Sequence, residues 1–241
     1  MTAGVRGAAD GGSGPLLTAV GLELTFGRNP ALRGANFTIE PGEMVAVLGP
    51  SGSGKSTLLH CLAGILVPTA GSVVFDGQEV SAMNDVRRSE LRRTSFGFVF
   101  QFGQLIPELT ALENVAMPLR LSGKRRRVAE RQALEWLDRL GVGSVADQRP
   151  GEISGGQGQR TAIARALVAG PRVVFADEPT GALDSVQGDE VMTLLASVAR
   201  ETDAAVVLVT HEPRVAAYSD REVIVRDGRT DDQRANGERN L

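Results

Sequence analysis

The segment GPSGSGKST at residues 49–57 constrains the fold of this chain more than any other feature. It matches the pattern G-x-x-x-x-G-K-[ST] and follows an apolar run, MVAVLG from Met44, that predicts a strand buried on both faces. The residues from Lys55 to Leu66 are apolar nearly all round and predict a buried helix that ends near Pro68. A strand, a glycine loop and a helix in this order predict an anion site, because glycine lets successive N–H groups face phosphate oxygens at a helix N-terminus.

The loop has a specific expected set of contacts with a nucleotide. We expect its backbone to surround phosphate oxygens, Lys55 to contact the β- and γ-phosphates, Ser56 to coordinate Mg²⁺ and Thr57 to contact the α-phosphate. The predicted nucleotide-binding residues here are Gly49, Pro50, Ser51, Gly52, Ser53, Gly54, Lys55, Ser56 and Thr57. A glycine- and serine-rich turn with a solvated lysine is the alternative, and the flanking strand and helix argue against it.

Two further apolar runs, RVVFAD and AAVVLVTH, predict strands that alternate with helical sequence. This alternation predicts an α/β fold with a mostly parallel sheet, in which ligands lie at the carboxyl ends of the strands. Three predicted strands end there in polar residues, namely Gly49 onwards, Asp177-Glu178 and His211. Short β-like runs in 16–39 predict an antiparallel edge subdomain, so the predicted fold class is a P-loop nucleotide-hydrolase core with that edge and an inserted α-helical subdomain.

The helical subdomain is expected at about 104–165, where the sequence becomes charged and helix-forming. Its amphipathic stretch from Arg126 to Leu140 has four expected core-facing residues, which are Val128, Leu134, Leu137 and Leu140. The basic run 124–127 could meet lipid headgroups or a partner, but a solvated helix start is favoured because acidic residues lie nearby. We expect residues 1–15 to be a disordered lead and 229–241 a polar tail.

Composition excludes several classes of function. The net charge of −3 lacks the basic footprint of a nucleic-acid binder, so no nucleic-acid partner is expected. The lone Cys61 excludes an intrachain disulfide, and we assign His60 and Cys61 to helix packing rather than to a metal. The N-terminal residues lack the apolar region of a secretory signal, and the longest apolar stretch, 58–67, is too short to cross a bilayer. Membrane contact is therefore expected only through a partner.

The segment RVVFADEPT offers two carboxylates at the end of a predicted strand. Asp177 would lie next to the Mg²⁺ held by Ser56. Glu178 would point to the opposite side of the extended chain and is the candidate to orient and deprotonate the attacking water. A solvated strand end would contain the same two carboxylates, and the neighbouring phosphate loop favours the catalytic interpretation.

The segment ISGGQGQR, 153–160, precedes a predicted helix at Ala162 to Val168. Ser154, Gly155 and Gly156 could therefore form a second anion-binding helix start. One chain has no evident use for two γ-phosphate sites, and taken alone the segment favours a simple helix cap by Ser154.

The motifs together, in the order GPSGSGKST, Gln101, ISGGQ, ADEPT, Asp184 and His211, resemble the ABC nucleotide-binding-domain family from Val20 to Gly228. ISGGQ departs from the family's LSGGQ by one apolar exchange, and Gly158 stands where Gln is common; neither change removes a phosphate-contacting group. The resemblance implies an ATPase domain over 16–228 that converts ATP and water to ADP and phosphate. It also implies two Mg-ATP molecules held in a head-to-tail dimer.

The resemblance implies further roles for single residues. Ser154, Gly155, Gly156 and Gln157 of one copy would contact the ATP bound by the other, and Asp184 would lie at the dimer seam. Gln101 would touch Mg²⁺ or the attacking water and sense a membrane partner, and His211 would hold the γ-phosphate and Glu178. Phe26 occupies the position of an adenine-stacking aromatic; a core phenylalanine near an edge strand is the alternative. The expected catalytic residues are Glu178, His211, Gln101 and Lys55, and the expected Mg²⁺ ligands are Ser56, Gln101 and Asp177.

Two segments, GFVFQFGQLIPELTALENVAMPL and ADEPTGALDS, are most similar to the branch with LolD, MacB and FtsE types. That branch implies a separate permease with a large extracytoplasmic region, and a peripheral place for this chain at the cytoplasmic face of the inner membrane. An ABC importer ATPase, a non-transport ABC ATPase of DNA repair or translation, a regulatory module and a metabolic kinase are the alternatives. Intact Lys55, Glu178 and His211 argue against a module without catalysis.

Overall fold

The strands of the central sheet are arranged in the order β10-β9-β3-β8-β7-β6. The computed structural model describes residues 14–101 and 103–232. The six strands are β3 (Met44–Leu48), β6 (Phe96–Phe100), β7 (Val173–Asp177), β8 (Ala205–Val209), β9 (Arg221–Arg226) and β10 (Arg229–Asp232). All neighbouring strands pair in parallel except β9 and β10. The predicted α/β class with a mostly parallel sheet is confirmed.

Both faces of the central sheet are buried. In β8, Val206 and Leu208 belong to the hydrophobic cluster on the side of the helical subdomain. Val207 and Val209 belong to the other cluster, which α1 and the second sheet cover. A continuous apolar run is typical of such a strand, because side chains alternate between two buried faces.

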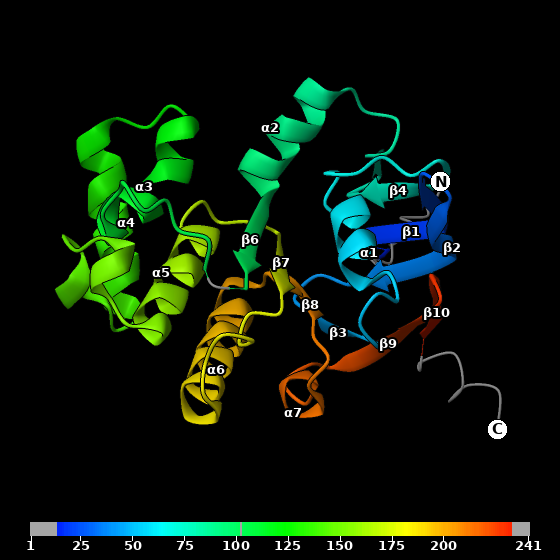
Figure 1. Cartoon of the computed structure of the whole chain (residues 1–241). Coiled ribbons are helices and arrows are strands. Elements are labelled where there is room, and N and C mark those ends of the chain that lie inside the picture. The colour runs from blue at the N-terminus through cyan, green and yellow to red at the C-terminus, as the bar shows by residue number, and fades with distance from the viewer. Residues whose placement is uncertain (1–13, 102, 233–241) are drawn as a thin grey trace, which may run out of the picture.

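The second sheet is antiparallel and has the order β2-β1-β4-β5. Its strands are β1 (Leu17–Phe26), β2 (Asn29–Ile39), β4 (Ala70–Phe75) and β5 (Gln78–Glu79). β1 and β2 form a hairpin that closes at Phe26 and Asn29, which confirms the predicted antiparallel edge. In Figure 1 this sheet lies on the right, beside α1 (Lys55–Leu62).

The helices divide into a group around the central sheet and a group at the far side of the molecule. The second group, drawn at the left of Figure 1 in green to yellow, contains α3, α4 and α5. The remaining elements are α2 (Asp85–Ser95), α3 (Ala111–Leu121), α4 (Arg126–Arg139), η1 (Gly143–Val145), η2 (Pro150–Glu152), α5 (Gly155–Leu167), α6 (Ser185–Thr202) and α7 (Pro213–Ala216). None of the helices within the described ranges is long and apolar enough to cross a membrane.

The buried face of α4 differs from the predicted one. Leu137 and Leu140 are buried as expected, but the exposed fractions of Val128 and Leu134 are 38% and 40%. Ala129 and Ala133 face the core in their place. α4 packs against α3, and small side chains at a helix contact let two helix axes approach closely.

Several predicted boundaries also need correction. α1 ends at Leu62 rather than near Pro68, and α5 begins at Gly155 rather than at Ala162. Residues 229–232, predicted as part of a loose tail, form β10 against β9. Residues 1–13 of the predicted lead and 233–241 of the tail lie outside the described residues. The helix α2 was not predicted, because its sequence has no apolar face and none of its residues is buried.

Candidate functional site

The loop between β3 and α1 needs glycine at particular positions. Gly49 has φ 154°, and a Cβ atom there would lie 2.2 Å from the Val225 carbonyl oxygen. Gly54 has φ 108°, and its Cβ would lie 2.5 Å from the carbonyl oxygen of Ala31. Both positions therefore exclude any larger residue by backbone conformation and by space. The loop is held against β9 and β2 with its N–H groups at the N-terminus of α1.

Lys55 is bent back over this loop. Its side chain is buried, and Nζ donates hydrogen bonds of 2.9 Å to the carbonyl oxygens of Gly49 and Pro50. The Ser53 hydroxyl is also buried and has no hydrogen-bond partner among the described residues. A buried ammonium group and a buried free hydroxyl in one loop suit an anionic ligand, since unpaired buried polar groups are costly.

A cleft of about 640 Å³ lies over the loop and gathers residues from distant parts of the sequence. It is lined by Phe26, Ala31, Pro50, Ser51, Gly52, Gly54, Lys55, Ser56, Thr57, Gln101, Glu178 and His211. Eleven of these twelve residues were expected site residues. Ala31 was missed, because a small side chain gives no chemical signal in a sequence.

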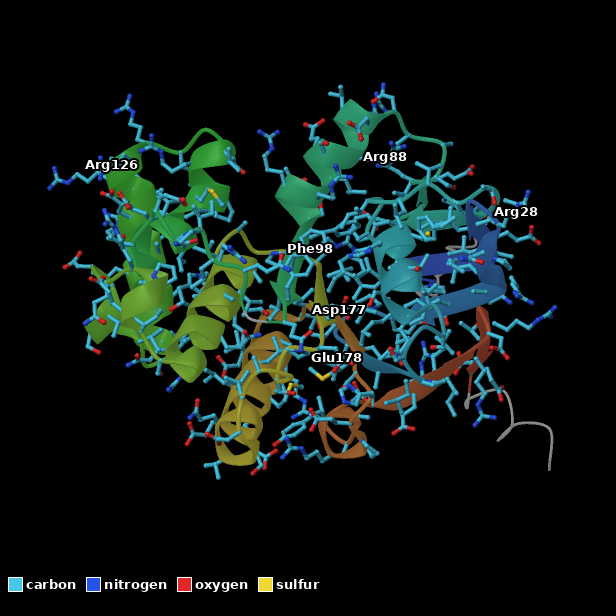
Figure 2. The ribbon with its side chains drawn as sticks, in the orientation of Figure 1. Arg28, Arg88, Phe98, Arg126, Asp177 and Glu178 are labelled. Carbon is cyan, nitrogen blue, oxygen red and sulfur yellow. The ribbon has the colours of Figure 1, made fainter. Side chains whose placement is uncertain are left out.

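Asp177 ends β7 beside the first turn of α1, and Figure 2 shows it with Glu178 near the centre of the molecule. Burial raises the pKa of the Asp177 carboxyl, and its hydrogen bond with Ser56 acts in the opposite direction. A carboxylate and a hydroxyl in contact provide the oxygen ligands that Mg²⁺ prefers. These two residues therefore fit the expected metal site.

Glu178 and His211 are hydrogen bonded to each other. His211 Nδ1 lies 2.8 Å from Glu178 Oε1, whereas Glu178 Oε2 is buried with no partner among the described residues. The two carboxylates were expected to diverge because an extended chain alternates its side chains. That reason is wrong, since the strand ends at Asp177 and Glu178 adopts left-handed backbone with φ 48°. This conformation is uncommon outside glycine and unfavourable for a glutamate.

Phe26 lies at the end of the β1–β2 hairpin, where its exposed fraction is 51%. The alternative of a core phenylalanine is therefore wrong. An exposed aromatic ring at the mouth of the cleft can stack on a planar base. Gln101 also lines the cleft and comes directly after β6.

The structure does not bring all of the expected site residues to this cleft. Ser154 caps α5, and its hydroxyl accepts from the backbone N–H of Gln157 while the Gln157 side chain accepts from the Ser154 N–H. Asp184 caps α6 through the N–H groups of Val186 and Gln187. The residues outside the cleft lining are Gly49, Ser53, Ser154, Gly155, Gly156, Gln157, Asp177 and Asp184. Gly49, Ser53 and Asp177 are neighbours of lining residues, whereas the other five belong to the starts of α5 and α6.

Comparisons with known proteins agree with this geometry. Residues 32–181 match the model of a family described as ABC transporter. The lipoprotein-releasing system ATP-binding protein LolD 2 of Caulobacter vibrioides is 45% identical over 226 residues, covering 92% of this chain and 99% of that protein. LolD of Xanthomonas oryzae pv. oryzae is 47% identical over 202 residues, covering 84% of this chain and 83% of that protein.

A solved structure gives the same result. The ATP-binding cassette MJ0796, in a dimeric post-hydrolysis state bound to ADP and Pi, superposes with a TM-score of 0.82 at 37% identity. The match covers 90% of this chain and 98% of that chain. The phosphate loop, the paired Glu178 and His211, and similarity along nearly the whole length agree with one another. This chain is therefore an ATP-binding and ATP-hydrolysing cassette that belongs to the ABC transporter family.

Proposed function

We propose that this chain is the ATPase subunit of a lipoprotein-releasing transporter, and that it works as a head-to-tail dimer with a separate permease. The observation that supports this most is its 45% identity with LolD 2 over 99% of that protein's length. The similarity therefore includes the helical subdomain and the surface around it, and it is not limited to the motifs that every cassette shares.

The residues of the cleft fit Mg-ATP. The glycine loop and Lys55 would bind the phosphates, and Phe26 would stack on the adenine. Ser56, Asp177 and Gln101 would hold Mg²⁺ through oxygen ligands. When bound, the ion would supply positive charge that neutralises the negative charge that develops during transfer.

Glu178 would act as the general base in hydrolysis of ATP to ADP and phosphate. Its buried Oε2 can accept a hydrogen bond from water, and His211 holds Oε1 at 2.8 Å. His211 would also contact the γ-phosphate from its exposed position, where 63% of its side chain is accessible. Because the water must attack in line with the leaving oxygen, fixing the carboxylate matters as much as its basicity.

A second copy would complete the site. The start of α5, with Ser154, Gly155, Gly156 and Gln157, lies outside the cleft of its own chain. The N–H of Gln157 donates to the Ser154 hydroxyl, so the N–H groups of Gly155 and Gly156 are the ones at this helix start that suit an anion. In a head-to-tail pair they would bind the ATP of the partner, with Asp184 at the seam. The dimeric state of the MJ0796 cassette supports this arrangement.

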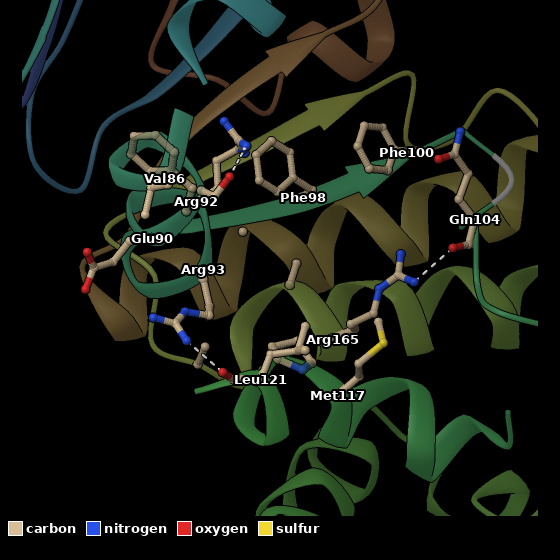
Figure 3. Close-up of a pocket in the computed structure, with 16 residues that line it drawn as sticks. Val86, Glu90, Arg92, Arg93, Phe98, Phe100, Gln104, Met117, Leu121 and Arg165 are labelled. Atoms are coloured by element: carbon tan, nitrogen blue, oxygen red, sulfur yellow. Dashed lines mark hydrogen bonds between the residues drawn. The ribbon is translucent and has the colours of Figure 1, made fainter. Parts of the chain in front are cut away.

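The permease would contact a groove of about 810 Å³ between α2, β6, α3 and α5. Figure 3 shows apolar side chains on two sides of it, Phe98 and Phe100 from β6 and Met117 and Leu121 from α3, together with Arg92, Arg93 and Arg165. The exposed fractions of Val86 and Leu121 are 77% and 61%, which is high for apolar side chains. Such a surface fits a helical segment with apolar and acidic side chains. We assign this segment to the cytoplasmic side of the permease, which places the chain peripherally at the inner membrane.

Reconstitution tests this proposal. The chain would be purified together with candidate permease subunits, and placed in vesicles that contain an acylated protein. We expect ATP-dependent release of the acylated protein into the soluble fraction, and no release with the Glu178→Gln variant. ATP hydrolysis without such release, or ATP-driven uptake of a solute instead, would exclude the lipoprotein assignment and favour another kind of ABC system.

A further inference from the structure

Within the part of α5 from Ala162 to Leu167, Arg165 alone has a charged side chain. Burial lowers the pKa of its guanidinium, which nevertheless stays charged because arginine does not lose its proton in proteins. A partly buried charge of this kind needs hydrogen-bond acceptors. The residues that supply these acceptors to Arg165 indicate a role in ATP hydrolysis.

The guanidinium of Arg165 binds two consecutive carbonyl groups. Nη2 donates to the Gly103 carbonyl oxygen and Nη1 to the Gln104 carbonyl oxygen, each at 2.8 Å (Figure 3 shows the bond to Gln104). Gly103 and Gln104 both have left-handed backbone, with φ 66° and 43°, so the guanidinium bridges the two carbonyls of a tight turn. For Gln104 this conformation is unfavourable, so the forked guanidinium stabilises a strained turn.

A second residue of α5 holds the other side of Gln101. Gln159 is buried, and its Nε2 donates at 3.3 Å to the carbonyl oxygen of Phe100, the last residue of β6. A Cβ atom on Gly103 would lie 3.3 Å from the Gly158 carbonyl oxygen, so this turn also packs directly on α5. Gln101 therefore lies between two attachments to the same helix.

Gln101 in turn contacts the catalytic segment. A Cβ atom on Gly181 would lie 2.8 Å from Gln101 Nε2, which means that the amide rests against the turn after Glu178. The N–H of Gly181 donates to the Glu178 carbonyl oxygen at 3.1 Å. A continuous series of contacts therefore runs from α5 through Gln101 to the base.

We propose that Arg165 is a positioning residue for ATP hydrolysis, because it fixes Gln101 to the helix that begins at Ser154. The inference rests on the proposed role of Gln101 in the cleft and of Ser154 at the ATP of a second copy. When the start of α5 binds that ATP, Arg165 and Gln159 move Gln101 with the helix. Closure of the dimer and alignment of Gln101 with the water then occur together.

A double-mutant cycle tests this. Arg165→Gln and Arg165→Lys would each be made alone and with Gln101→Ala, and kcat and KM for ATP would be measured on the chain with its membrane subunits. We expect Arg165→Gln to lower kcat roughly tenfold with KM for ATP unchanged, as for a residue that acts only through alignment. Lysine keeps the charge but not the fork, so its loss should be smaller. In the Gln101→Ala background neither change should lower kcat further.

Arg172→Gln is the matched control, because Arg172 forms an exposed ion pair with Asp76 away from the cleft, and kcat should not change. If Arg165→Gln lowers kcat equally with Gln101 present and with Gln101→Ala, the inference is overturned and Arg165 has a purely structural role. Undiminished turnover of Gln101→Ala alone would instead overturn the role of Gln101 in the proposed function, and the inference with it. Thermal melting of each variant shows whether it is folded. If Arg165→Gln misfolds, the double-mutant cycle is measured with Arg165→Lys instead.

Discussion

At the scale of single residues, the site depends on buried polar side chains that have few hydrogen-bond partners within the chain. Lys55 is buried and bonded only to two loop carbonyls by the contacts described, and Glu178 keeps one carboxylate oxygen without a partner among the described residues. The Lys55 ammonium is thereby held over the loop, and Glu178 keeps a carboxylate oxygen that can accept a hydrogen bond. Groups fixed in this way are typical of a preorganised site.

Replacing Lys55 by alanine should weaken ATP binding by about 10- to 100-fold, the value of a lost hydrogen bond to a charged group. The change can be measured by titration with a fluorescent ATP analogue. Arg172→Gln again serves as the control, since this cation is remote from the loop. Unchanged affinity of the alanine variant would show that Lys55 does not bind the phosphates.

Cys61 should be unreactive in the folded protein. It is buried in α1, and burial raises the pKa of its thiol from 9.0 to about 12. Since the thiolate is the reactive form, maleimide at pH 8 should label the unfolded chain and not the native one. The sign of the shift also predicts that Cys61 lowers the free energy of unfolding as pH rises from 9.0 towards 12, because only the unfolded chain then releases the proton. Mass spectrometry of labelled protein checks the first point, with Cys61→Ala as the blank.

At the scale of elements, α4 shows how a helix selects its buried face. Ala129, Ala133 and Leu137 face the core, whereas Leu134 is 40% exposed although it is as large and apolar as Leu137. Close packing against α3 favours a stripe of small side chains, so hydrophobicity alone does not predict which face of α4 is buried.

The two leucines of α4 form a matched pair for a stability test. Leu137→Ala should lower the free energy of unfolding by about 2–5 kcal/mol, because it leaves a cavity in a fully buried position. Leu134→Ala, with the same change in helix propensity, should cost less than about 1 kcal/mol. Urea unfolding followed by circular dichroism measures both values. Equal losses would contradict the observed orientation of α4.

At the scale of the whole molecule, the proposed function requires two copies of the chain. The loop with Lys55 lines the cleft, whereas the start of α5, proposed as the other half of the phosphate site, lies outside the lining of that cleft. Association of two copies in opposite orientation would unite the halves twice. ATP would then stabilise the closed pair, and loss of the γ-phosphate would release it, which is a shift of population by a ligand.

Glu178→Gln should separate these steps. The amide keeps the size of the side chain but cannot take a proton, so ATP binding should persist while turnover falls by roughly 10² to 10⁴. The unhydrolysed nucleotide should then retain the closed pair, which light scattering after gel filtration would detect as a dimer with Mg-ATP. Phosphate release at the wild-type rate would exclude Glu178 as the base. A monomer under these conditions would contradict the head-to-tail dimer.

The sequence by itself determined the phosphate loop, the strands and the polar residues at their ends, because these depend on local conformation and on periods of a few residues. Gly49 to Thr57, Asp177 and His211 could be found in this way. Only the tertiary structure decided that Ala31 lines the cleft, that Glu178 leaves the strand, and that Arg165 holds the turn after Gln101. The contacts of Ala31 and Arg165 join residues far apart in the chain, 61 positions for Arg165 and Gln104, and close packing rather than a local pattern selects them.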